Sequence, residues 1–432
     1  MSEKDKVVPK GNLGILVGGG PAPGLNGVIS AVTIEARRRG LNVYGIYDGY
    51  RWLVKGDETV FMGHVKELRI RDVSRIHFDG GSILRSSRTN PVKVEHGIEN
   101  SVRMLQKLNI RYMATIGGDD TAYGASEIAK AAKGKIKFAH VPKTIDNDLP
   151  LPNNLPTFGF QTARHLGTLL VKNLMEDARM TERWHIVVAM GRHTGHLALG
   201  IAKSAGVTLA IIPEEFKKEG PISIHHVCDI FETTILKRRA MGNRHGVLVI
   251  AEGIVERLSE DELKSVPGAV LKYDIYDHLM IAEIEFGKLI KNEIERRFEK
   301  RGESMKLVEI NIGYVLRCMD PIPFDQEYTR DLGYHAVNYL LSDKPEHQIN
   351  ALIVVDNGKM CPIPFDQMID PKTKKTEVRF VDVHSDSYKV ARSYMVRLEK
   401  RDLEDHTLLK NMAAEAKMTE KEFINRYGYL VQ

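Results

Sequence analysis

The chain has 432 residues, of which 43% are hydrophobic and 28% are charged, and this length suggests two or three domains or two large α/β lobes. The formal net charge of +5 comes from basic residues spread along the chain, which argues against a nucleic-acid-binding protein. The three cysteines, Cys228, Cys318 and Cys361, are far apart in the sequence, which argues against a disulfide framework or a zinc site.

The first predicted element is a short buried strand over residues 13–17, followed by a glycine-rich segment over residues 18–26. A helix with one apolar face is expected from residue 28 to about residue 40. A strand, a glycine-rich loop and a helix in this order can direct backbone N–H groups toward a phosphate. The loop fits neither the dinucleotide-binding fingerprint nor the Walker A pattern, so a simple tight turn remains the alternative.

Strands and helices then alternate up to residue 141, and small or polar residues follow the strands. Further strands are predicted at residues 41–47, 112–116 and 136–141, and helices at 97–108 and 122–132. The loops rich in glycine and polar residues lie at 80–88, 117–121 and 141–148. This alternation predicts a parallel sheet flanked by helices, in which ligands bind at the carboxyl ends of the strands.

The segment VPKTIDND, residues 141–148, carries the most chemistry and is predicted to be the loop at the end of a buried strand. It places Asp146 and Asp148 two residues apart, behind Lys143 and Thr144. On a loop, one carboxylate can contact a substrate hydroxyl while the other lies near a divalent cation. The alternative is a polar turn in which Asp and Asn side chains bond to their own backbone.

A second α/β unit is predicted to begin near residue 157. Its helices are expected at 161–175 and 281–301, and its strands at 184–189, 206–212, 246–251 and 307–315. Later elements are expected to be a helix at 332–341, strands at 351–355 and 378–383, and a helical tail whose last helix starts with a capping box of Thr419 and Glu422. The expected division is a lobe of residues 1–157 with a return segment near 325–375, and a lobe of residues 158–324 completed by the tail 376–432.

Taken together and in this order, the motifs GGGPAPGLN, GGDDT, PKTIDND, MGR, AEG and YVLR resemble those of the phosphofructokinases, and more narrowly their pyrophosphate-dependent branch. They cover about residues 14–330. The resemblance implies two Rossmann-like lobes, each a mainly parallel sheet flanked by helices, with the active site in the cleft between them. It implies further that the first lobe binds pyrophosphate and Mg²⁺ and that the second binds the sugar phosphate.

The resemblance also implies roles for single residues. Asp146 is the expected general base, which takes the proton from the 1-hydroxyl of fructose 6-phosphate. Asp119 and Asp148 are the expected neighbours of Mg²⁺, which keeps waters and phosphate oxygens as its other ligands. Arg192 is expected beside the transferring group. The residues expected near the donor are Gly19, Arg88 and Thr121, and those expected near the sugar phosphate are Thr144, Ile145, Asp146, Met190, Gly191, Arg192, Glu252, Tyr314, Val315, Leu316, Arg317 and, from a neighbouring subunit, Arg183.

Two residues bear on the choice of phosphoryl donor. Family members that use ATP have glycine at the positions of Asp120 and Lys143 in this chain. The carboxylate of Asp120 would repel the α-phosphate of ATP, because like charges at close range repel strongly in a dry site. Lys143 supplies a positive charge that can stabilise the phosphate leaving group of pyrophosphate. Both residues point to pyrophosphate as the donor.

The sequence therefore predicts a Mg²⁺-dependent, reversible transfer of a phosphoryl group from pyrophosphate to fructose 6-phosphate, a step of glycolysis and gluconeogenesis. The alternatives are an ATP-dependent 6-phosphofructokinase, a non-catalytic nucleotide or phosphosugar sensor, and a lipid or NAD kinase. Because Arg183 is expected to reach a neighbouring subunit, we expect a homodimer or a homotetramer. The polar N-terminus and the lack of an apolar stretch of ~18 residues predict a cytoplasmic protein with no membrane span.

Overall fold

The computed structural model describes residues 11–217, 220–266, 284–368 and 377–431. The chain divides into two compact units. Unit 1 comprises Met1–Ala163 and Val315–Arg379, and unit 2 comprises Arg164–Tyr314 and Phe380–Gln432. Each unit contains a mainly parallel sheet with helices packed against it, which confirms the predicted α/β class.

Unit 1 is built around a mainly parallel sheet. Its strands are β1 (Asn12–Val17), β2 (Asn42–Ile46), β3 (Val65–Leu68), β4 (Ile110–Gly117), β5 (Lys137–Thr144), β6 (Phe158–Gly159), β11 (Ala351–Leu352) and β14 (Ile363–Pro364). They follow the order β14-β11-β5-β4-β1-β2-β3, and β6 pairs with β5. The central strands run parallel, whereas β3 and β14 at the edges pair antiparallel. Strands β12 (Val355–Asp356) and β13 (Lys359–Met360) form a separate hairpin.

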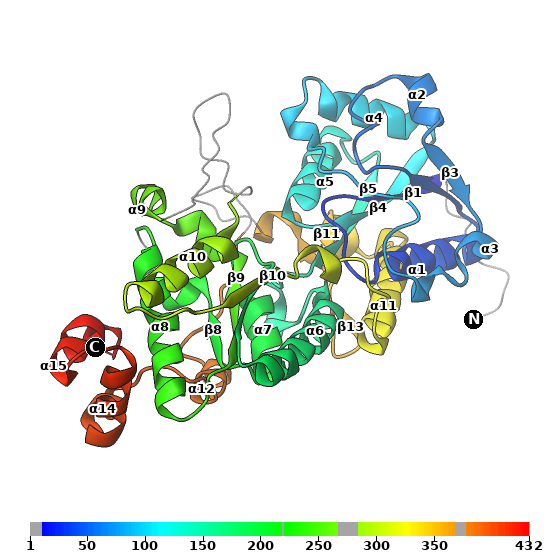
Figure 1. The fold of residues 1–432 in the computed structure, drawn as a ribbon. Coiled ribbons are helices and arrows are strands. Elements are labelled where there is room, and N and C mark those ends of the chain that lie inside the picture. The colour runs from blue at the N-terminus through cyan, green and yellow to red at the C-terminus, as the bar shows by residue number, and fades with distance from the viewer. Residues whose placement is uncertain (1–10, 218–219, 267–283, 369–376, 432) are drawn as a thin grey trace. The chain divides into compact units, whose positions relative to one another are not determined.

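Helices cover both faces of this sheet. Helices α1 (Leu25–Arg38) and α11 (Pro323–Leu340) pack together on one face, and α4 (Gly97–Lys107) and α5 (Asp119–Ala131) pack on the other (Figure 1). The short helices α2 (Glu58–Met62) and α3 (Ile70–Val73) precede and follow β3. The central strands β1, β4 and β5 are therefore mostly buried, as parallel strands covered on both faces must be.

Unit 2 is built around a smaller, wholly parallel sheet with the order β10-β7-β9-β8. Its strands are β7 (Trp184–Ala189), β8 (Leu209–Ile211), β9 (Gly246–Ala251) and β10 (Leu307–Asn311). Its helices are α6 (Phe160–Thr181), which starts at the end of unit 1, α7 (His196–Ala205), α8 (Ile224–Ala240), α9 (Glu260–Ser265) and α10 (Phe286–Glu299). Trp184 of the sheet, Phe231 of α8 and Phe298 of α10 lie in one buried apolar cluster.

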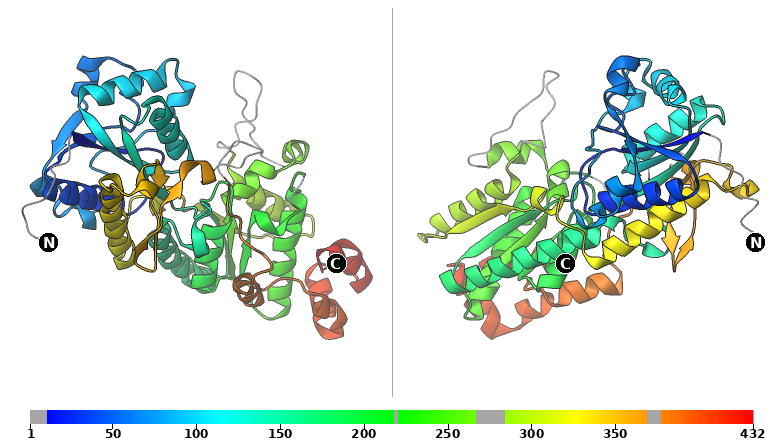
Figure 2. Two further views of the ribbon diagram at one scale, coloured as in Figure 1. Left: turned by 180° about the vertical axis from the view of Figure 1, so that it is seen from behind. Right: turned by 90° about the vertical axis from the view of Figure 1, so that its right-hand side faces the viewer.

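The C-terminal residues of unit 2 form α12 (Asp386–Ser393), α13 (Lys400–Glu404), α14 (His406–Glu415) and α15 (Glu420–Tyr427). Helix α14 packs against α8 (Figure 2). The predicted capping box is confirmed, because Thr419 and Glu422 each accept the backbone N–H of the other. No helix in the described ranges is long and apolar enough to cross a membrane.

Two predicted boundaries near the motifs of unit 1 are corrected. Helix α5 begins at Asp119 rather than at residue 122, because Gly118 adopts an extended conformation and serves as its N-cap. Asp119 and Asp120 therefore lie in the first helical turn, where carboxylates interact favourably with the positive end of the helix dipole. Strand β5 continues to Thr144 rather than stopping at residue 141, so Lys143 belongs to the sheet and not to the loop.

Further corrections fall in the second half of the chain. Strand β10 ends at Asn311 rather than at residue 315, because the side-chain oxygen of Asn311 accepts the N–H of Gly313 at 2.9 Å and turns the chain. The predicted strand at 378–383 does not form, since Val381 N–H bonds to a side chain, that of Glu214. Helix α11 starts at Pro323, a residue that suits the first helical turn, rather than at 332. Residues 281–283 of the predicted helix 281–301 lie outside the described residues, and α10 covers most of the rest.

Candidate active site

Most of the predicted site residues of unit 1 lie at or just beyond the carboxyl ends of three neighbouring parallel strands, β1, β4 and β5. Strand β1 lies between β2 and β4, so the strand order reverses direction beside β1. Open α/β sheets bind ligands at such a switch point. Residue pairing places Val17 beside Ile116, and Gly117 beside Pro142. The loops that follow β1, β4 and β5 therefore begin side by side at one edge of the sheet.

Thr121 fills the space between the first two of these loops. Its side chain is buried, and a Cβ atom added to Gly18 or to Gly117 would lie 2.4 Å from its hydroxyl oxygen. Only glycine fits at both positions. The carbonyl of Thr121 accepts a hydrogen bond from the hydroxyl of Tyr50 at 3.0 Å. Thr121, which was predicted to bind the donor, is thus packed beneath the loops and supports them.

Gly19 lies in the left-handed region, with φ of 81°, against the loop at residues 86–88. Its N–H donates to the Ser87 carbonyl at 2.9 Å, and its carbonyl accepts from the Ser86 hydroxyl at 2.5 Å. The N–H group of Gly19, a residue expected near the donor, is therefore bonded within the chain. Arg88, which was also expected near the donor, is exposed. Arg317 lies beside the same loop, because its guanidinium carbon would lie 3.7 Å from a Cβ atom on Gly20.

The first turn of α1 is packed against its own unit. Leu25 and Asn26 are buried, and the Asn26 amide donates to the carbonyls of Asp79 and Gly80 at 3.2 Å. The side-chain oxygen of Asn26 accepts the N–H of Ile83 at 2.9 Å. The first turn of α5, by contrast, carries exposed residues. The accessible helix start at this edge is therefore that of α5 and not, as the sequence suggested, that of α1.

Lys143 is the buried charge at this edge. Its side chain is only 6% exposed, and burial lowers its pKa to about 8. The carboxylates of Asp146, Asp148 and Asp119 act in the opposite direction, while Arg317 adds to the lowering of the pKa. The ammonium nitrogen would lie 3.5 Å from a Cβ atom on Gly19. The buried ammonium of Lys143 thus lies near the loops after β1, β4 and β5, and all three predicted carboxylates influence its pKa.

The turn after β5 is held by hydrogen bonds of its own residues. The Thr144 hydroxyl accepts the N–H of Asp146 at 3.0 Å, and the Thr144 carbonyl accepts from the Thr157 hydroxyl at 2.7 Å. Asn147 lies in the left-handed region, with φ of 57°, and its side-chain oxygen accepts the N–H of Thr157 at 3.1 Å. Ile145 is buried and anchors the turn, while Asp146 and Asp148 are partly exposed. These bonds shape the turn that carries the two carboxylates.

The site residues of unit 2 also gather at the carboxyl edge of a parallel sheet. Residue pairing places Ala189 of β7 beside Ala251 of β9, and Val188 beside Asn311 of β10. Met190 and Glu252, the next residues, therefore leave the sheet side by side. A Cβ atom on Gly253 would lie 2.6 Å from the Arg192 carbonyl, so the two loops touch.

Arg192 and His193 share a carboxylate that the sequence analysis did not single out. Arg192 donates to Glu256 at 2.5 Å, and the Nδ1 atom of His193 lies 3.2 Å from the other oxygen of Glu256. Burial raises the pKa of Glu256, but the bonds from His193 and Arg192 outweigh this effect and hold the pKa below its ordinary value. The Arg192 side chain is 73% exposed, so Glu256 orients it while leaving it accessible.

Arg183 does not join the other site residues of unit 2. It precedes β7 and lies at the amino edge of the sheet, opposite Met190, and its N–H donates to the Ala178 carbonyl. The YVLR motif starts with the turn Tyr314–Leu316, in which Tyr314 is 76% and Val315 is 58% exposed while Leu316 is buried.

The carboxylates of unit 1 fit a magnesium ion. In the described part of the chain, no three His, Cys, Asp or Glu side chains come close enough to enclose a metal ion. Mg²⁺ does not need such a cage, because it is commonly held by one or two carboxylates together with waters and phosphate oxygens. Asp119 and Asp148, which both act on Lys143, offer that donor set.

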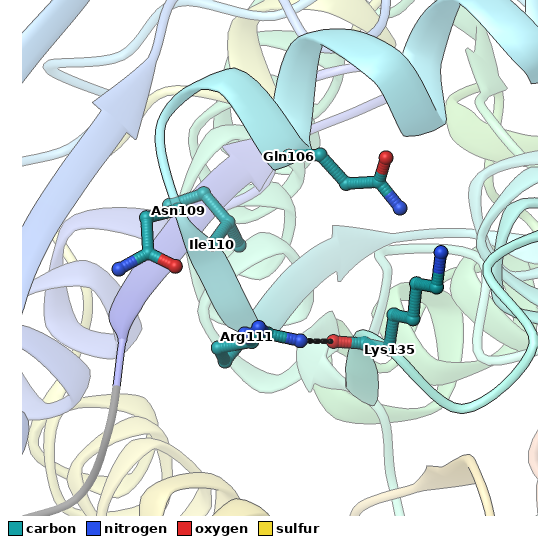
Figure 3. Close-up of a pocket in the computed structure, with 5 residues that line it drawn as sticks. All are labelled: Gln106, Asn109, Ile110, Arg111 and Lys135. Carbon is teal, nitrogen blue, oxygen red and sulfur yellow. Dashed lines mark hydrogen bonds between the residues drawn. The ribbon is translucent and has the colours of Figure 1, made fainter.

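A pocket lies at the other edge of the sheet of unit 1 (Figure 3). It has a volume of about 300 Å³ and is lined by Gln106, Asn109, Ile110, Arg111 and Lys135. The Arg111 guanidinium donates to the Lys135 carbonyl at 3.4 Å. Because Ile110 begins β4, this pocket lies at the amino ends of the strands and does not include the predicted site residues.

Comparison with known proteins identifies the family of the chain. Residues 12–340 match the family model described as Phosphofructokinase. The chain is 54% identical to the pyrophosphate--fructose 6-phosphate 1-phosphotransferase of Thermotoga maritima, over 97% of this chain and 99% of that protein. It is 50% identical to the protein of the same name from Naegleria fowleri, over 99% and 98%. Its fold is similar to that of a pyrophosphate-dependent phosphofructokinase from Nitrosospira multiformis, with a TM-score of 0.62 at 16% identity over 89% of this chain and 90% of that chain. The chain belongs to the phosphofructokinase family.

Proposed function

We propose that this protein transfers a phosphoryl group from pyrophosphate to the 1-hydroxyl of fructose 6-phosphate. The products are fructose 1,6-bisphosphate and phosphate, and the step is reversible and serves glycolysis and gluconeogenesis. The observation that carries the proposal is the buried ammonium of Lys143 among the carboxylates of Asp119, Asp146 and Asp148. The names of the two relatives that match over nearly their whole length support it.

In the proposed reaction, Asp146 accepts the proton of the sugar 1-hydroxyl. The oxygen of that hydroxyl attacks one phosphorus atom of pyrophosphate. A new P–O bond forms to the sugar, the bridging P–O bond breaks, and phosphate leaves. Lys143 neutralises the charge that develops on the leaving phosphate. Asp119 and Asp148 would hold Mg²⁺, which supplies further charge neutralisation when bound. Positioning and charge neutralisation account for most of the catalysis in such a transfer.

Pyrophosphate rather than ATP is the proposed donor because of Asp120 and Lys143. Asp120 is exposed in the first turn of α5, next to the loops at the switch point. A nucleoside triphosphate would bring an additional phosphate into this region, where it would meet the Asp120 carboxylate. Pyrophosphate has no such group, and Lys143 attracts its charge.

Unit 2 is proposed to bind the sugar phosphate through Met190, Gly191, Arg192, Glu252 and Tyr314. Arg183 lies at the opposite edge of the sheet of unit 2, which supports a role toward the sugar phosphate of a neighbouring subunit. We therefore propose that the protein acts as a homodimer or a homotetramer. A place in the cytoplasm is a separate proposal, made from the sequence. Light scattering coupled to size-exclusion chromatography will measure the subunit number, and a monomer would contradict the role of Arg183.

A donor assay tests the proposed function directly. Purified protein is mixed with fructose 6-phosphate, Mg²⁺ and either pyrophosphate or ATP, and the fructose 1,6-bisphosphate formed is measured with a coupling enzyme. We expect rapid product formation with pyrophosphate, little with ATP, and none after a chelator removes Mg²⁺. Asp146→Asn should abolish turnover while the circular dichroism spectrum stays unchanged. Turnover with ATP but not with pyrophosphate would overturn the proposal.

A further inference from the structure

Arg379, the last residue of unit 1, donates several hydrogen bonds to the turn that carries Asp146 and Asp148. Its guanidinium donates to the Asn147 carbonyl from Nη2 at 2.9 Å and from Nε at 3.2 Å. Nη2 also donates to the Asn147 side-chain oxygen at 2.5 Å, and Nη1 donates to the Leu155 carbonyl at 2.9 Å. The backbone N–H of Arg379 donates to the Asp148 carbonyl at 2.7 Å.

The residue that Arg379 holds is the pivot of the turn. Asn147 lies directly between the two carboxylates and has φ of 57°, a left-handed conformation that asparagine tolerates better than most residues but adopts less readily than glycine. If Asn147 relaxed to a negative φ, the chain on either side would rotate, and Asp146 and Asp148 would move relative to each other. A planar guanidinium that binds the carbonyl and the side chain of one residue fixes both its backbone and its side chain.

In the described part of the chain, the other hydrogen bond of Asn147 restrains its side chain and not its backbone carbonyl. The Thr157 N–H reaches only the side-chain oxygen, at 3.1 Å, and leaves the carbonyl of Asn147 unrestrained. Burial lowers the pKa of Arg379 and the nearby Asp148 carboxylate raises it, and an Arg side chain stays protonated at neutral pH. A partly buried cation with several donors therefore bonds to backbone carbonyl groups of this turn and of Leu155.

We propose that Arg379 is a positioning residue for phosphoryl transfer, which holds Asn147 in its left-handed conformation and thereby sets the placement of Asp146 and Asp148. This inference rests on the proposed roles of these two carboxylates. Arg379 touches the turn and acts through it. Small displacements of reacting groups reduce rates strongly, since a misplacement of about 1 Å costs on the order of 10²-fold.

The test compares Arg379→Ala with Arg37→Ala in the donor assay, well below the melting temperature of each variant. Arg37 is a matched control in unit 1. It donates to the backbone carbonyl of Leu68 and to the side chains of Asn42 and Glu67, at distances of 2.7–2.9 Å. We expect Arg379→Ala to lower kcat on the order of 10²-fold with the KM for fructose 6-phosphate changed by less than about threefold. Arg37→Ala should keep the wild-type kcat. Equal kcat values for the two variants would overturn the proposal.

Two further measurements separate positioning from a general loss of stability. Millimolar guanidinium should restore part of the kcat of Arg379→Ala and should not stimulate Arg37→Ala. Arg379→Lys keeps the charge but not the planar fork, and we expect it to keep no more than about a tenth of the wild-type kcat. No rescue of Arg379→Ala together with full activity of Arg379→Lys would contradict the mechanism.

A double-mutant cycle with Asn147→Gly tests the pathway from Arg379 to the carboxylates. Glycine keeps the left-handed backbone accessible but removes the side-chain oxygen. If Arg379 acts through Asn147, the double variant will lose less activity than the product of the two single losses. Independent, multiplicative losses would overturn the inference. Asp146→Asn in the same assay tests the proposed function separately, because full activity of that variant refutes the base whatever Arg379 does.

Discussion

Lys143 links the stability of unit 1 to its proposed use of pyrophosphate. Its pKa is about 8 in the folded protein, compared with 10.5 for an ordinary lysine, and its side chain is 6% exposed. One pKa unit corresponds to about 1.4 kcal/mol, so the charged form of this buried side chain destabilises the ligand-free fold by about 3 kcal/mol at neutral pH. Pyrophosphate would compensate this cost by supplying negative charge.

The sign of the pH dependence follows from the direction of this shift. Between pH 8 and pH 10.5 the unfolded chain keeps a proton on Lys143 that the folded protein has released. The contribution of Lys143 to the free energy of unfolding therefore rises with pH across this window. Lys143→Met, which has similar length and no charge, should remove this rise. At pH 7 it should increase the free energy of unfolding of the ligand-free protein by at most about 3 kcal/mol.

The same substitution should damage function. Loss of the cation should lower kcat with pyrophosphate on the order of 10²–10³-fold, the effect expected when one preorganised charge-stabilising donor is removed. Urea unfolding at pH 7 and pH 10 measures the stability, and thermal unfolding with and without pyrophosphate measures binding. Wild-type protein should gain stability from pyrophosphate, and Lys143→Met should gain much less.

Lys137 is the matched control for this experiment. It starts the same strand β5, and burial lowers its pKa to about 8 as well, but its ammonium donates to the carbonyls of Tyr339 and Ser342 at 2.8 and 3.2 Å. Lys137→Met should leave kcat and the stabilisation by pyrophosphate unchanged. The reasoning is refuted if Lys143→Met turns over pyrophosphate within tenfold of the wild-type rate, or if pyrophosphate stabilises it as much as it stabilises the wild type.

Three other substitutions test separate parts of unit 1. Asp120→Gly, alone or with Lys143→Gly, should allow ATP to support turnover in the donor assay, and a variant that still discriminates fully against ATP would contradict the role of Asp120. Burial lowers the pKa of His140 from its ordinary 6.5 to about 3. The free energy of unfolding should therefore fall by about 1.4 kcal/mol for each pH unit below 6.5, and His140→Gln should remove this slope in urea unfolding. The Asp325 carboxylate accepts the N–H of Gly159 and both the N–H and the hydroxyl of Thr162, at 2.5–2.9 Å. Asp325→Ala should therefore lower the free energy of unfolding by about 3 kcal/mol. No change would show that these donors find other partners.

Much of the fold is predictable because its signals are local. Short apolar runs bounded by glycine or polar residues are sufficient to indicate β1, β4, β5, β7 and β9. Parallel strands have their carboxyl ends at one edge, so the loops after them can be expected to meet. Element ends are less predictable, since Asp119 enters α5 only because Gly118 caps the helix, and Lys143 extends β5 only because β6 pairs with it.

The sequence by itself determined the α/β class, the ordered motifs and the residue types of the candidate site, because these depend on neighbours within a few positions. Only the tertiary structure decided how those residues are held. Three features depend on residues that are distant in the chain. They are the burial that lowers the pKa of Lys143, the hydrogen bond from Arg192 to Glu256, and the hydrogen bonds from Arg379 to Asn147. Asn147 alone carried a local signal, because asparagine tolerates the left-handed conformation. Arg379 carried none, since a hydrogen bond across 232 residues depends on the packing of the whole unit and leaves no pattern in the sequence beside either partner.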